Sequence, residues 1–238
     1  MKNFATTLAW MLLCICVAGC AGRDKSRPLT DTQSKAKTTL ETQMQAATQT
    51  AQTYHAMDNP ALLKKLVEQS KVQKEPFNSL AYRELKQRKD VDPESLVALV
   101  KQNQDAGGVL PLLLLRKQSN KLYLGVQPAI RAKILTSALQ GSKHFNTWGL
   151  PNLYLEDASH AMIEAGRPAV PDLKRMLSDT RPAPVFGSQE YMVYEQYKYR
   201  LCDYALFFLE RIEGHADFQM PKSVAERDTL IKQMAAKK

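Results

Sequence analysis

Glycine and cysteine are scarce in this sequence, and their scarcity excludes several classes of protein. Of 238 residues, 10 are glycine and 4 are cysteine. Neither a phosphate-binding P-loop nor a dinucleotide-binding fingerprint occurs, which argues against nucleotide cofactors. Three of the four cysteines lie within the first 20 residues, so Cys202 is the one thiol in the remainder of the chain. A single thiol builds neither a disulfide framework nor a thiolate zinc site. Because Cys202 lies in an apolar stretch, we expect it to be buried and inert.

Signatures of catalysis are missing as well. None of the four histidines, His55, His144, His160 and His215, stands at metal-ligand spacing from another histidine or cysteine. The sequence has no Gly-x-Ser-x-Gly elbow and no Cys–His nucleophile signature. We therefore expect no metal, no cofactor and no enzymatic activity. A hydrolase stays as an alternative, since paired carboxylates need not be close in sequence.

The first 19 residues have the three parts of an export signal. Lys2 is their only charge, residues 4–17 are mostly apolar, and the small residues Ala18 and Gly19 precede Cys20. The apolar run is too short for a permanent membrane helix, which takes about 20 apolar residues. An ordinary secretory signal, leaving Cys20 as a plain thiol, and a single-pass membrane helix are the alternatives. The charges at 23–25 argue against the helix.

Val17-Ala18-Gly19-Cys20 resembles the lipobox of bacterial lipoproteins. The resemblance implies diacylglycerol on the Cys20 thiol, cleavage just before it, and anchoring of the chain to a membrane. In enterobacterial lipoproteins, an aspartate directly after the lipidated cysteine is a mark for retention in the inner membrane. Ala21 in that place favours the periplasmic face of the outer membrane, for a Gram-negative host. Nucleic acid is disfavoured as a partner, because an exported and tethered protein rarely meets it.

The segment behind Cys20 is predicted to be a tether. Residues 21–34 have a flexible composition, and residues 30–54 contain eight threonines and five glutamines. A thin heptad seam nevertheless runs through the second stretch. It covers only about two heptads, so we expect a weakly amphipathic helix and keep self-association as an alternative. The seam residues are Leu40, Met44, Ala47, Ala51 and Tyr54.

Helical signals are regular from residue 59 onward, which predicts an all-α body. We expect a signal peptide over residues 1–19, a tether and Thr/Gln-rich helix over 20–58, and a helical domain over 59–238. Prolines open several segments, as they do at first turns of helices. The apolar run at 109–115 is too short for a membrane span and belongs in a core. The predicted starts are Asn59-Pro60, Pro76, Asp92-Pro93 and Pro128.

One helix pair carries a second resemblance. The series Ala161-Met162-Ile163-Glu164-Ala165-Gly166, Ala169-Val170-Pro171-Asp172-Leu173 and Met176-Leu177-Ser178-Asp179 looks like one HEAT-type helical repeat. Arg200-x-x-Asp203-Tyr204-Ala205 resembles the start of a later repeat helix in bacterial HEAT-like proteins. The resemblance covers roughly residues 126–235. It implies antiparallel helix pairs stacked as a short solenoid, with Gly166 in a left-handed cap.

An insertion between these two pairs, residues 181–199, departs from the repeat pattern. Five of the nine tyrosines fall between residues 191 and 204. Tyrosine offers a large contact area with a polar tip and is favoured at interfaces. We expect a recognition surface there, with the alternative that the rings seal the insertion against the helices. The candidate residues are Trp148, Phe186, Tyr191, Tyr194, Tyr197 and Tyr199.

The charge distribution supplies a competing function. Residues 60–133 hold 14 basic and 7 acidic residues, a net charge of +7. This half could bind an anionic envelope polymer or lipid headgroups, or it could simply have lysine-rich solvated faces. We expect above all a membrane-anchored, non-enzymatic scaffold or assembly factor that binds another envelope protein, since helical repeats offer long surfaces and few reactive pockets.

Overall fold

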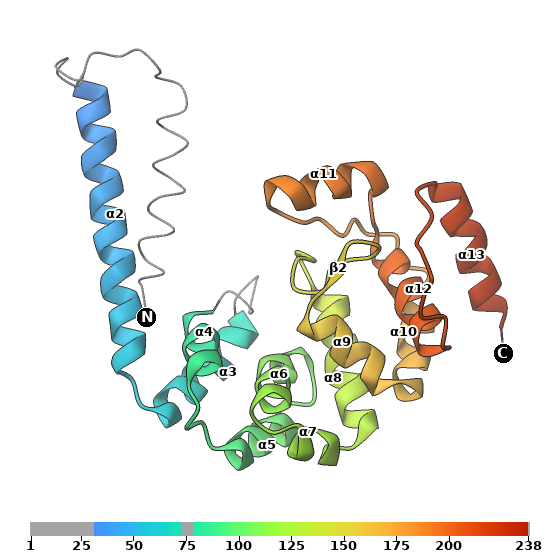
Figure 1. Cartoon of the computed structure of the whole chain (residues 1–238), viewed down its shortest axis with the longest axis horizontal. Helices are drawn as coiled ribbons and strands as arrows, with labels where there is room; N and C mark the ends of the chain where they lie inside the picture. Colours follow the sequence, from blue (N-terminus) through green and yellow to red (C-terminus); the bar gives the residue numbers. More distant parts are fainter. Residues whose placement is uncertain (1–30, 73–78, 238) are drawn as a thin grey trace. The chain divides into compact units, whose positions relative to one another are not determined.

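The computed structural model describes residues 31–72 and 79–237 (Figure 1). Over these residues the fold is all-α, with a single two-stranded sheet, as the sequence predicted. Cys20, the signal segment and Pro76 lie outside the described residues. The first helices are α2 (Asp31–Ala56), α3 (Asn59–Val72), α4 (Leu80–Gln87), α5 (Pro93–Gln102), α6 (Val109–Gln118), α7 (Asn120–Gly125) and α8 (Pro128–Gly141). They are followed by α9 (Asp157–Ala165), α10 (Val170–Met176), α11 (Ser188–Tyr197), α12 (Leu201–Ile212) and α13 (Val224–Ala236).

The chain divides into two compact units, residues 1–57 and 58–238. Within the first unit, α2 is a 26-residue helix. The predicted seam lies on this helix, with Leu40 and Met44 exposed at 39% and 40%. Four threonine hydroxyls of α2 donate to the carbonyl four residues earlier, so these side chains satisfy themselves locally. Self-association through the seam stays a prediction.

Short polar side chains begin several helices of the second unit. Ser79 accepts from the Tyr82 amide before α4, and Asp92 accepts from the Glu94 and Ser95 amides before α5. The sequence interpretation placed the cap of α3 at Asn59, but Asp58 fills that role, because its carboxylate accepts from the Ala61 amide at 2.8 Å. Asn59 is the first helical residue, and its side chain is free to bond Arg88 and the Asp90 carbonyl.

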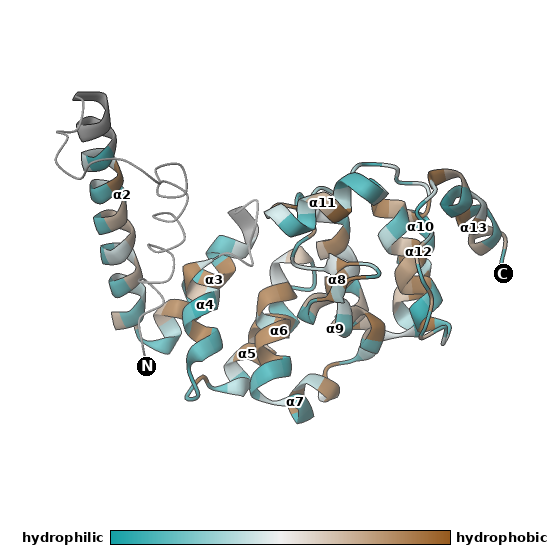
Figure 2. Cartoon of the chain, turned by 45° about the horizontal axis from the view of Figure 1, so that its top comes forward, coloured by the Kyte–Doolittle hydropathy of each residue, from teal (hydrophilic) through white to brown (hydrophobic). Residues whose placement is uncertain are grey.

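Helices that follow one another in sequence pack against one another. Such contacts join α3 to α4, α5 to α6 and α8 to α9, and contacts between these pairs join α3 to α6 and α6 to α8. The apolar run at 109–115 forms α6 and is buried along its whole length, as predicted. Apolar residues accordingly line the inner faces of the helices (Figure 2). A regular solenoid built from these pairs stays a prediction.

A β-hairpin interrupts the helices at residues 149–155. Strand β1 (Gly149–Leu150) pairs antiparallel with β2 (Tyr154–Leu155). Gly149 and Asn152 both have positive φ, 78° and 71°, which closes the turn between such short strands. Sequence analysis did not predict these strands, because two-residue strands leave no alternating pattern.

The turn after α9 also differs from the expectation. Gly166 has a positive φ of 67°, which explains the glycine, but its ψ of −146° is not that of a left-handed cap. The extended ψ turns the chain straight into a 3-10 turn at Arg167–Ala169, and α10 begins at the next residue.

Gly149 provides a test of this fold. Replacing Gly149 by alanine places a Cβ 2.3 Å from the Tyr154 carbonyl oxygen in a positive-φ conformation. We expect a loss of about 1–3 kcal/mol in the free energy of unfolding, measured by urea denaturation. Gly141→Ala is the matched control, because a Cβ at Gly141 meets nothing within 4 Å. Equal stability of the two variants would contradict the hairpin geometry.

Candidate functional site

Helix α11 is the most exposed element of the predicted recognition surface. None of its residues is buried. Tyr191 and Met192 are 52% and 73% exposed. The half-buried residues Val193, Tyr194 and Tyr197 recur at helical spacing, so they mark the face that is partly covered. The other face of α11 therefore presents an aromatic ring and a flexible thioether to solvent.

The exposed face carries its own polar contacts. The Tyr191 and Tyr194 rings lie 6.4 Å apart, between centroids. Lys198 donates to the Glu195 carboxylate at 2.6 Å, and hydrogen bonding to Glu195 raises the pKa of Tyr191.

Phe186 precedes α11 and is 46% exposed. The side chain of Asn146, which lies before the β-hairpin, holds the Phe186 backbone. The Asn146 amide nitrogen donates to the Phe186 carbonyl at 2.6 Å, and the Phe186 amide donates to the Asn146 side-chain oxygen at 2.9 Å. Its ring meets the His144 ring edge-on at 5.7 Å. Asn146 thereby bonds the Phe186 backbone as a residue of a neighbouring strand would. This holds the exposed aromatic ring in place.

Two of the six predicted surface residues are in the core instead. Trp148 and Tyr199 are both 0% exposed. The Trp148 indole donates to the Ser142 hydroxyl at 2.8 Å, and the Tyr199 hydroxyl donates to the Pro151 carbonyl at 2.9 Å. The Tyr199 ring seals the insertion against the body, which was the alternative interpretation, whereas the Trp148 ring packs against Phe208 of α12. The sequence could not separate the two roles, because exposed Tyr191 and buried Tyr199 belong to the same tyrosine-rich stretch.

We define the recognition surface as Phe186, Tyr191 and Met192, and Tyr194 borders it on the partly covered face of α11. Met192 was not among the predicted residues, although methionine is enriched at interfaces. Tyr197 belongs to the boundary, because its ring stacks on buried Tyr199 at 4.9 Å. The arrangement offers apolar and aromatic contact area, which suits binding.

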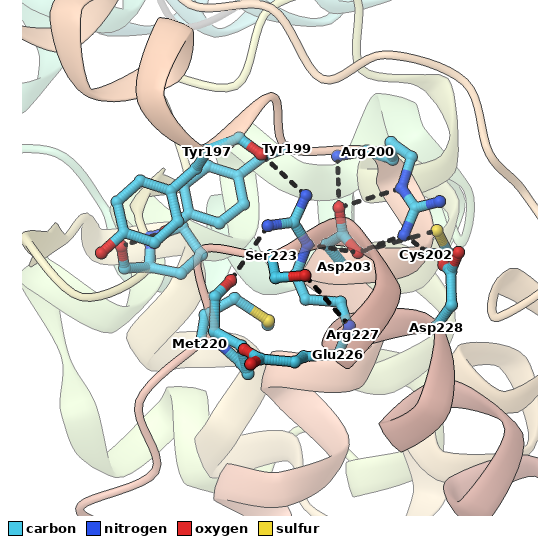
Figure 3. A network of polar contacts seen from close by, with 12 residues as sticks. Tyr197, Tyr199, Arg200, Cys202, Asp203, Met220, Ser223, Glu226, Arg227 and Asp228 are labelled. Carbon is cyan, nitrogen blue, oxygen red and sulfur yellow. Dashed lines mark hydrogen bonds and ion pairs between the residues drawn. The ribbon is translucent and has the colours of Figure 1, made fainter.

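Asp203 is the centre of a buried polar network beside this surface (Figure 3). It is 0% exposed at the first turn of α12. Its carboxylate accepts from the Arg200 amide at 2.9 Å and from the Arg200 guanidinium at 2.9 Å. The Arg200 guanidinium also donates to Asp228 of α13 at 2.7 Å. The Arg200–Asp203 pair therefore caps α12 and reaches a neighbouring helix.

Arg227 supplies the second cation of the network and is itself 0% exposed. Its Nε lies 3.1 Å from the Asp203 carboxylate. Its two terminal nitrogens donate to the carbonyls of Pro221, Lys222 and Tyr197 at 2.7–2.9 Å. No local pattern singles out this arginine, because it lies in a polar helix where charges are ordinarily solvated.

Cys202 is the one cysteine among the described residues, and it is buried beside the network. Cys202 is 1% exposed, and burial raises its pKa to about 11. The thiolate is the nucleophilic form, so the thiol is inert near neutral pH. This confirms the expectation for Cys202.

Several basic residues of the 60–133 half are engaged in ion pairs. Arg116 forms a two-pronged pair with Glu164, at 2.5 and 3.0 Å. That pair is the main reason the pKa of Glu164 is lowered, and the nearby His160 lowers it to a smaller extent. Lys86 pairs with Asp157 at 3.3 Å. These charges connect α4 and α6 to α9, which lowers the charge available to an anionic surface.

Among the described residues, no cluster of three or more histidine, cysteine or acidic side chains is placed to hold a metal ion. No helix in residues 31–72 or 79–237 is both long and apolar enough to cross a membrane.

By its fold and its candidate site, this chain is an all-α protein with an exposed aromatic surface. No protein-family model matches the chain. No curated protein and no solved structure matches it either.

The buried ion pair yields a stability prediction. Asp203→Asn leaves the Arg227 guanidinium buried without its counter-ion, so we expect a loss of about 3–5 kcal/mol in the free energy of unfolding. Thermal and urea unfolding measure the change. Asp217→Asn, which removes the same charge from an exposed position, should change stability by less than about 0.5 kcal/mol. Similar losses in both variants would refute a central role for Asp203.

Proposed function

We propose that this protein is a lipid-anchored, non-enzymatic scaffold or assembly factor of the bacterial cell envelope, which binds another envelope protein through the recognition surface. The observation that carries the proposal is that α11 buries none of its residues and presents Tyr191 and Met192 to solvent. Tyrosine and methionine are enriched in protein interfaces. A helix with no buried residue gains little stability from core packing. This supports a role for its exposed face in binding a partner.

The location rests on the resemblance of residues 17–20 to a lipobox. Lipid on Cys20 anchors the chain, and Ala21 supports the outer membrane as the destination. Several acyl chains on one residue stabilise anchoring, at about 0.8 kcal/mol per buried methylene. A protein held in this way meets envelope partners at a raised local concentration, which lets a small recognition surface suffice.

The binding proposal predicts loss of a partner when the exposed face of α11 is changed. A photo-crosslinking amino acid at Met192 should capture one protein from intact cells. With the crosslinker at Gln189 instead, the combined substitutions Tyr191→Ser and Met192→Ser should lower capture about tenfold or more relative to the protein without them. The reason is that aromatic anchors at interfaces contribute about 2 kcal/mol or more.

Gln196→Ser is the control for this experiment, because Gln196 is exposed on the same helix without an apolar side chain. It should capture the partner as the wild type does. Capture that survives the double substitution, or no specific capture at Met192, contradicts the proposal.

The anchoring proposal predicts that Cys20→Ser abolishes lipid attachment. The variant should incorporate no labelled palmitate and should leave the membrane fraction in alkaline carbonate. Cys202→Ala is the matched control, since it removes the other cysteine of the processed chain and should keep both the label and the membrane fraction. Labelled palmitate on the Cys20→Ser protein would overturn the assignment.

A further inference from the structure

Charged groups contribute to the attachment of helix α13 to the body. Its buried side chains are Arg227 and Met234, of which one is a cation. Arg200 pairs with Asp228 at 2.7 Å, and Lys237, directly after the helix, pairs with Glu213 at 2.7 Å. The attachment therefore combines these polar contacts with apolar contacts on one face of the helix.

One of these contacts reaches α11. The Arg227 guanidinium donates to the Tyr197 carbonyl at 2.7 Å (Figure 3). Tyr197 is the last residue of α11, and the last carbonyls of a helix have no amide partner within the helix. A cation at this end is also favoured by the helix dipole. Arg227 thus completes the C-terminal end of the recognition helix from a different helix.

The position of α11 depends on contacts at its two ends. At the N-terminal end, Asn146 fixes the backbone of Phe186. At the C-terminal end, Arg227 bonds the Tyr197 carbonyl, and the Tyr197 ring stacks on Tyr199. Between the ends no residue of α11 is buried and one face is only partly covered, so the end contacts contribute much of what holds the helix.

We propose that α13 positions the recognition surface, and that Arg227 is the residue through which it does so. Release of α13 removes the bond to Tyr197 and one of the two cations at Asp203, so the C-terminal end of α11 loses one of the contacts that hold it. The state of α13 then regulates binding. This regulation rests on the proposed function, whereas the coupling between α13 and α11 is a property of the chain by itself.

Hydrogen–deuterium exchange of the folded protein measures the coupling without a partner. Arg227→Gln and Lys232→Gln each remove one positive charge from α13, the first at a buried and the second at an exposed position. We expect Arg227→Gln to speed exchange of the amides at 194–198 about tenfold, as a local opening does, while Lys232→Gln matches the wild type. Amides of α8 should exchange as in the wild type in both variants.

Asp228→Asn is a milder variant for the case that Arg227→Gln does not fold. It breaks the bond from Arg200 to α13 and leaves both cations on Asp203. It should speed exchange in α13 and, to a smaller extent, at 194–198. Faster exchange in α13 with unchanged exchange at 194–198 overturns the coupling, and so does unchanged exchange in both segments.

The crosslinking assay separates this inference from the proposed function. If the exchange results hold but no variant captures a partner at Met192, the proposed function fails and the coupling stands. If the wild type captures a partner and Asp228→Asn captures it equally well with α13 loosened, the proposed function stands and the regulation by α13 is overturned.

Discussion

The carboxylate of Asp203 is fully buried, and the C-terminal third of the protein is arranged to satisfy it. An unpaired charge in a protein interior costs several kcal/mol, so such a group needs both a counter-ion and hydrogen bonds. Arg200 supplies an amide and a guanidinium, and Arg227 supplies a second guanidinium. Each arginine has further N–H groups, and these donate hydrogen bonds to groups on neighbouring segments. One buried anion thereby sets the relation of α11, α12 and α13.

The β-hairpin meets a similar demand for its backbone groups. A non-helical segment inside a helical protein exposes carbonyls that no helix satisfies. The carbonyls of Gly149 and Pro151 accept from the hydroxyls of Tyr204 and Tyr199. Asn152 forms a matched pair of bonds with the Met220 backbone, at 2.7 Å each. Side chains from later segments complete the hairpin, so it is stable only when the chain has closed over it.

Local signals in the sequence predicted much of the fold. The buried run at 109–115 and the starts at Asp92-Pro93 and Pro128 follow from spacing and capping alone. The candidate surface was predicted only in part. Trp148 and Tyr199 have the same composition signal as Tyr191, and only tertiary packing decides which rings are buried. Arg227 and Asn152 act across about 30 and 68 residues of sequence, so no local pattern could reveal them.

The Thr/Gln-rich helix α2 has a mechanical consequence. At 1.5 Å per residue its 26 residues span about 39 Å. A flexible chain of the same length would sample many distances, whereas a helix has one. If Cys20 carries lipid, the length of α2 contributes to how far from the membrane the second unit can bind a partner. Shortening α2 by whole turns would then reduce that reach without changing any contact residue.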